Sequence, residues 1–168
     1  MGISKSRSNT RSLIGLSAVS LAIAAIITFA PRPSQPEQGW QPPTDYAIVD
    51  TISLEDGRTL RLWTGPSGWY VESLASGRHQ GAVGAASGGD QYSVSEILDG
   101  LVGYLPTTGA QAVSVGSPAS VRADVHSGVF LVPASVIGAT DRAVSVTPLD
   151  ANGKALAPET PVAVAGRG

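Results

Sequence analysis

The chain has 168 residues, no cysteine, 14% charged residues and a formal net charge of −2. The lack of cysteine excludes disulfides, thiol catalysis and thiolate metal ligands. Lys and Arg do not cluster beyond the first dozen residues, so we expect no nucleic-acid partner. The length suits one small domain beside a membrane segment.

An apolar segment over 13–30 follows a basic amino-terminal stretch. Its eighteen residues carry no charge, and Lys5, Arg7 and Arg11 precede it. At about 1.5 Å per residue, a helix of this length spans roughly 27 Å, close to the hydrocarbon thickness of a bilayer. Basic flanks stay on the cytoplasmic side. We therefore predict a cytoplasmic tail over 1–12, a transmembrane signal anchor over 13–30, and an extracytoplasmic location for the rest.

A cleaved secretory signal is the alternative interpretation of the same segment. A charged start, an apolar run and small residues near its end are the parts of a signal peptide. Here Pro31 follows the small residue Ala30, and proline suits the extended substrate channel of a peptidase poorly. We favour the uncleaved anchor, with a secreted β domain as the alternative.

Residues 31–45 form a Pro-rich linker. Five prolines fall within thirteen residues, with Gln, Ser and Gly between them, a composition that stays extended and cannot bury a core. Trp40 is the one large aromatic residue there. It either anchors at the membrane interface or packs on the folded domain. We favour packing because ten residues separate Trp40 from the apolar segment.

From residue 46 the pattern becomes that of short strands. Strands predicted over 48–54 and 59–63 flank Asp56-Gly57, a pair that favours a tight hairpin. A third strand over 69–74 follows the Gly-Pro-Ser-Gly turn at 65–68. The remaining predicted strands cover 101–105, 120–125, 129–132 and 143–149.

These strands predict a mainly β fold, with one antiparallel two-sheet sandwich over 46–160 and a flexible tail over 161–168. In the strand over 120–125, the alternation assigns Val121, Ala123 and Val125 to the core.

Two segments give weaker strand signals. Residues 76–91 are Gly-rich, so we expect a loop with at most a weak strand over 82–86. Residues 95–99 are expected to form a short helical turn. There, apolar residues recur at helix spacing, and Ser93 with Glu96 matches a capping box.

The carboxyl-terminal half carries turn and core motifs, including SGVFLVP at 127–133 and LDANGKAL at 149–156, with others at 103–106, 112–115, 121–123 and 144–147. This arrangement resembles the tails of exported, largely uncharacterised actinobacterial proteins. Those tails carry a Gly-x-Phe-x-x-x-Pro motif, and the corresponding motif at 128–133 differs from it by one residue in spacing. The resemblance implies an immunoglobulin-like or transthyretin-like sandwich. It implies no catalytic residue and no substrate.

Candidate chemical groups are few. Asp150, Asn152 and Gly153 match the start of a calcium loop, but the position of its bidentate Glu is Pro161, so we expect a plain turn. His79 and His126 are the only imidazoles and are interpreted as surface residues. A Gly-x-Ser-x-Gly elbow is absent from the sequence. We expect no metal, no cofactor and no enzymatic activity.

Three aromatic residues are the candidate binding residues: Trp63, Trp69 and Tyr70. Side chains of this size either fill a core or anchor a partner. We expect a non-catalytic binding or interaction module of the cell envelope, anchored through 13–30, whose partner is an envelope protein or a cell-wall component. The alternatives are a passive structural spacer and a small hydrolase that uses His79 or His126 with a carboxylate.

Overall fold

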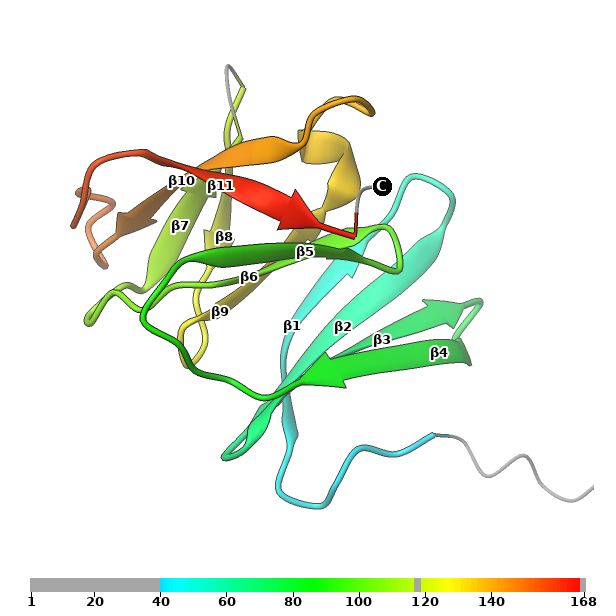
Figure 1. Cartoon of the computed structure of the whole chain (residues 1–168). Helices are drawn as coiled ribbons and strands as arrows, with labels where there is room; N and C mark the ends of the chain where they lie inside the picture. Colours follow the sequence, from blue (N-terminus) through cyan, green and yellow to red (C-terminus); the bar gives the residue numbers. More distant parts are fainter. Residues whose placement is uncertain (1–39, 117–118, 167–168) are drawn as a thin grey trace, which may run out of the picture. The chain divides into compact units, whose positions relative to one another are not determined.

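The computed structural model describes residues 40–116 and 119–166 (Figure 1). These residues form eleven strands and one short 3-10 helix, arranged in two sheets. The predicted cytoplasmic tail, the membrane segment over 13–30 and most of the linker lie outside the described residues. Within the described part of the chain, no helix is long and apolar enough to cross a membrane.

The first sheet is a four-stranded antiparallel meander in the order β1-β2-β3-β4. Its strands are β1 (Ala47–Ser53), β2 (Arg58–Gly65), β3 (Gly68–Ala75) and β4 (Arg78–Ala85). Both predicted hairpins are confirmed. In the first, Gly57 has a φ of +83°, and Oδ1 of Asp56 accepts a hydrogen bond from the backbone N–H of Arg58 at 3.0 Å.

Strand β4 corrects the loop predicted over 76–91. It pairs with β3 from Ala75↔Arg78 to Trp69↔Ala85. Ser76 and Gly77 form the connecting turn with φ values of +50° and +75°, and positive φ at both central residues is typical of a tight hairpin. The low apolar content that predicted a loop reflects the position of β4 at the sheet edge, where small residues lie exposed.

The second sheet has seven strands in the order β8-β7-β10-β11-β5-β6-β9. Its strands are β5 (Ser93–Ile97), β6 (Gly100–Tyr104), β7 (Ala112–Val115), β8 (Val121–Asp124), β9 (Val129–Pro133), β10 (Ala143–Leu149) and β11 (Thr160–Ala165). The 3-10 helix η1 (Ala134–Val136) follows β9. The end strands β8 and β9 lie close to each other, so the sheet curves into a nearly closed barrel.

The mainly β fold of two sheets is confirmed, but the prediction that all strands pair antiparallel is wrong. Strands β5 and β11 pair in parallel, with Val94 opposite Val164. Such a contact joins residues about 70 positions apart in the sequence, and local periodicity carries no information about it. The remaining neighbours in both sheets pair antiparallel.

A hairpin replaces the helical turn predicted over 95–99. Strands β5 and β6 pair antiparallel, and Leu98 with Asp99 forms the turn at φ values of +54° and +67°. Apolar residues occur at helix spacing because β6 is buried on both faces, with Leu101 and Val102 both in the core. A strand buried on both faces loses the period-two alternation. The strand predicted over 101–105 is confirmed by β6.

Two further predictions are corrected in the seven-stranded sheet. Strand β11 occupies most of the segment predicted as a tail over 161–168, and its Val162 and Val164 are buried. Val121, predicted to face the core, is 41% exposed, because β8 ends the sheet and has one paired neighbour. Ala123 and Val125 do pack against the core, as predicted.

The core consists of two clusters. One fills the barrel around Phe130, and the other lies between the two sheets. The second joins Leu60, Leu62, Trp69 and Val71 of the four-stranded sheet to Val102, Val129 and Leu131 of β6 and β9. The four-stranded sheet therefore has an inner face against the barrel and an outer face turned away from it.

Candidate functional site

The outer face of the four-stranded sheet carries a cluster of rings that we call the aromatic face: Trp40, Tyr46, Trp63, Tyr70 and His79. Trp63 on β2 lies directly opposite Tyr70 on β3. Trp40 covers both, with ring centroids 6.1 Å and 5.8 Å away, respectively. Edge-to-face contacts of this kind stabilise beyond simple burial. Trp40 therefore packs on the folded domain, as predicted.

The two remaining rings extend the cluster along the sheet. His79 on β4 stacks on Trp40, with centroids 5.4 Å apart and an interplanar angle of 11°. Tyr46 meets Tyr70 edge to face at 5.0 Å. Tyr70 in turn lies over Gly84 on β4, where a Cβ atom would overlap its ring. The small residue in β4 is thus what lets the Tyr70 ring lie flat against the sheet.

Beneath these rings lies a buried carboxylate. Glu72 on β3 is 5% exposed. Its Oε2 accepts a hydrogen bond from Nε1 of Trp63 at 3.2 Å, and its Oε1 lies 3.2 Å from Nδ1 of His79. Arg61, opposite Glu72 on β2, brings a guanidinium nitrogen to 3.9 Å. A buried charge is costly without partners, and these contacts supply them. They also hold Trp63 and His79 of the aromatic face against Glu72 on β3.

The structure separates the three predicted binding residues. Trp63 and Tyr70 lie together on the aromatic face and are partly exposed. Trp69 points to the inner face, is 9% exposed and belongs to the core between the sheets. Alternation along β3 is the reason, since neighbouring residues of a strand point to opposite faces. Trp69 is therefore a core residue.

The sequence did not identify His79 or Glu72 as part of this cluster. The loop predicted over 76–91 includes His79, but His79 lies on β4 opposite Leu74. Glu72 was not singled out, although its position two residues after Tyr70 places both side chains on one face. The other histidine, His126, lies near the start of β9, where it forms an isolated β-bridge with Val129.

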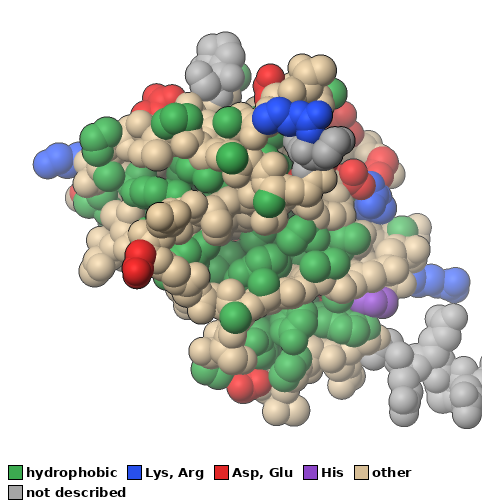
Figure 2. Space-filling model, in the orientation of Figure 1, with side chains coloured by type: hydrophobic (Ala, Val, Ile, Leu, Met, Phe, Trp, Pro, Cys, Tyr) green, Lys and Arg blue, Asp and Glu red, His purple; other side chains and the backbone are tan. Residues whose placement is uncertain are grey.

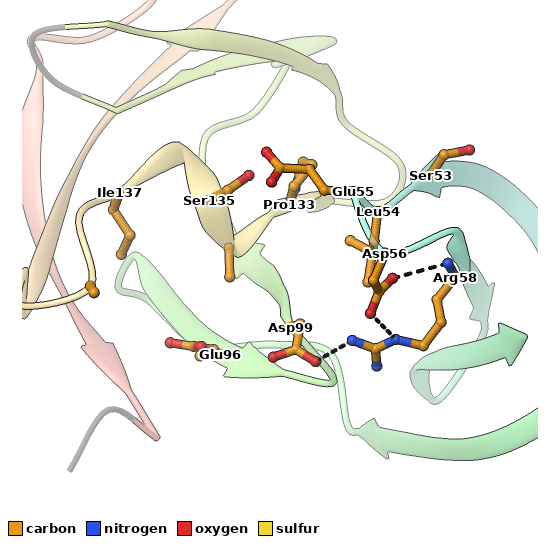
Figure 3. A pocket seen from close by; sticks show the side chains of 12 residues that line it. Ser53, Leu54, Glu55, Asp56, Arg58, Glu96, Asp99, Pro133, Ser135 and Ile137 are labelled. Carbon is orange, nitrogen blue, oxygen red and sulfur yellow. Dashed lines mark hydrogen bonds and ion pairs between the residues drawn. The ribbon is translucent and has the colours of Figure 1, made fainter.

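A separate cavity of about 570 Å³ lies where the β1–β2 turn, the β5–β6 turn and η1 meet (Figure 3). Its lining residues are Ser53, Leu54, Glu55, Asp56, Arg58, Glu96, Asp99, Pro133, Ala134, Ser135, Ile137 and Ala139. Arg58 joins its two sides, because it forms ion pairs with Asp56 and Asp99, both at 2.6 Å. The ion pair with Asp56 lies within the β1–β2 turn region, whereas the ion pair with Asp99 links the four-stranded sheet to the β5–β6 turn of the other sheet.

The ion pair between Asp56 and Arg58 predicts that the stability of the fold depends on pH. The pKa of Asp56 is held below its ordinary value of 3.8, first by the hydrogen bond from the backbone N–H of Arg58 and then by the Arg58 side chain. A lowered folded-state pKa stabilises the fold above the unfolded-state pKa, and this contribution is lost as the pH falls through the folded-state value.

We therefore expect Asp56→Asn to lower Tm at neutral pH, and the difference from the wild type to disappear in acid. Thermal unfolding between about pH 2 and 7 measures it. A Tm difference that stays constant over that range would contradict the role of the Asp56 charge.

The described residues hold no group of three or more His, Asp or Glu side chains placed to bind a metal ion. The Asp150 segment forms a turn: Oδ1 of Asp150 accepts hydrogen bonds from the backbone N–H groups of Asn152 and Lys154, at 2.8 and 2.9 Å. Asp150 and Gly153 thus form the turn predicted for this segment.

No family model matches this chain, and neither a curated protein nor a solved structure matches it significantly. The comparisons thus give no support to the immunoglobulin-like or transthyretin-like relationship expected from the sequence. What stands is a mainly β fold of two sheets, with an aromatic face on one of them.

Proposed function

We propose that this chain is a single-pass, membrane-anchored protein of the cell envelope whose extracytoplasmic β domain binds a partner without catalysis. The apolar segment over 13–30 and the basic residues before it support the anchor and its orientation. The partner is another envelope protein or a cell-wall component.

The aromatic face is the observation that carries the binding role. Trp40, Trp63 and Tyr70 remain partly exposed, and the ring centroid of Trp40 lies 6.1 Å from that of Trp63 and 5.8 Å from that of Tyr70. Trp and Tyr dominate the energetics of many interfaces, because they offer a large apolar area together with a hydrogen-bonding group. A passive spacer would have no reason to gather such rings on one face.

His79 and Glu72 are the imidazole and the carboxylate that the hydrolase alternative would use. A general base acts through a ring nitrogen within hydrogen-bond reach of the proton that it takes. One face of the His79 ring is stacked on Trp40, and Nδ1 is directed at Glu72. Glu72 is itself held by Trp63 and approached by Arg61. The cluster is thus arranged to keep the aromatic rings in place.

Partner capture tests this proposal. The full-length protein, tagged after Gly168, is crosslinked in cells and purified. We expect Trp63→Ala and Tyr70→Ala to lose a partner that the wild type retains, because each removes a ring of the aromatic face.

Val121→Ala is the matched control, since it removes an exposed apolar side chain from the other sheet. Thermal unfolding of each variant shows whether it is folded. Equal capture by folded Trp63→Ala, Tyr70→Ala and Val121→Ala would refute the aromatic face as the binding site.

A further inference from the structure

Strand β4 forms an open edge of the four-stranded sheet. It pairs with β3 on one side, and among the described strands none pairs with it on the other. An edge strand offers a row of backbone N–H and C=O groups to any strand that approaches it, so proteins usually protect such edges with charges, proline or bulges.

The edge strands β1 and β8 carry such protection. Strand β1 has a bulge between Ile48 and Asp50 and bears the Asp50 charge. Strand β8 bears Arg122 and Asp124 and lies beside β9 at the barrel seam. Each has at least one feature that discourages pairing with another chain.

Strand β4 is protected only at its beginning. Arg78 is its one charged residue, and its register shift lies between His79 and Gly81. From Gly81 to Ala85 the pairing with β3 is regular, with no charge and no proline. Val83, at the centre of this stretch, is 42% exposed. In Figure 2 the surface over the β3 and β4 region is mainly hydrophobic side chains and backbone.

We propose that β4 pairs with β4 of a second copy of this chain, antiparallel about a two-fold axis at Val83. This register places Val83 opposite Val83 of the second copy, Ala82 opposite Gly84, and Gly81 opposite Ala85. The two exposed valines then cover each other, and the small residues leave room for close approach. The product is a closed dimer with an eight-stranded continuous sheet.

Charge also favours this self-pairing. In the antiparallel register the two Arg78 side chains lie at opposite ends of the strand pair. A parallel arrangement in register would instead place Arg78 against Arg78 and His79 against His79. Like charges directly opposite each other destabilise a strand pair, so the antiparallel dimer is the one that the sequence of β4 fits.

The chain has no native cysteine, so a single introduced cysteine can form only an intermolecular disulfide. Residues directly opposite in an antiparallel pair have Cα atoms about 4.5–5.5 Å apart, within the range of a disulfide. In detergent micelles, full-length Val83→Cys is expected to oxidise to a dimer readily. Val121→Cys, equally exposed and also on an edge strand, is the control and should not.

A second variant measures the unlinked protein. Val83→Lys places two ammonium groups opposite each other, and we expect light scattering to show a monomer where the wild type is a dimer, with Tm of the domain retained. A monomeric wild type, or crosslinking of Val83→Cys no faster than that of Val121→Cys, would overturn the proposal. So would crosslinking in cells of Val83→Cys to a different protein and not to itself.

Discussion

Replacement of Trp69 by alanine is expected to destabilise the domain severely, by about 3–5 kcal/mol, the range for truncating a large buried aromatic residue. Trp69 is 9% exposed and packs between the two sheets with Leu62 and Val71. Its loss leaves a cavity at the contact that joins the four-stranded sheet to the barrel. Denaturant unfolding followed by circular dichroism measures the change.

Tyr70→Ala is the matched comparison, because the neighbouring residue has the opposite orientation. Tyr70 lies on the aromatic face and is partly exposed, so its truncation should cost clearly less stability than that of Trp69. The assignment of Trp69 to the core fails if Trp69→Ala unfolds at the same denaturant concentration as the wild type but no longer captures the partner.

Gly103→Ala is expected to have the second large effect. Gly103 on β6 lies opposite Phe130 on β9, and a Cβ atom at this position would overlap the Phe130 ring. Phe130 is completely buried in the barrel core, so the ring has no free space to enter. Overpacking of this kind costs about 1–3 kcal/mol, and more where the backbone must move. The free energy of unfolding measures the effect.

Gly81→Ala provides the control for that substitution. Gly81 is also in a strand, but a Cβ atom there meets no atom within 4 Å. Its replacement should change stability by no more than about 0.5 kcal/mol. Equal stability of Gly103→Ala and Gly81→Ala would contradict the close packing of Phe130 against β6.

Local features of the fold were predictable from the sequence, because the residues that determine them are adjacent. Asp56-Gly57 indicated the first hairpin, since an Asp side chain and a positive φ at Gly are what the turn requires. The strands on either side were identified with an error of one or two residues.

The parts that sequence analysis missed have different causes. Strand β11 becomes a strand through pairing with β10, which precedes it, and with β5, about 70 positions earlier in the chain. Strand β4 has few apolar residues, and β3 supplies its pairing partner. Leu98 and Asp99 both adopt left-handed backbone conformations, which Asp favours more than most residues but Leu does not.

The candidate site was predictable in part. Trp63, Trp69 and Tyr70 stood out by size, but the register of β2 and β3 decides which of Trp69 and Tyr70 shares a face with Trp63. Trp40 and His79 join the same cluster from a linker and from an unpredicted strand. Sequence alone could not bring together four segments whose order in the sheet was unknown.

Photo-crosslinking in cells would test the binding role of the aromatic face most directly. A photoreactive amino acid replaces Ile48, which lies opposite Trp63 and is 45% exposed. In a second variant it replaces Val121, which is 41% exposed and lies on the barrel. We predict a specific adduct with one partner from position 48 and none from position 121. No adduct from position 48, or the same adduct from both positions, would contradict the account.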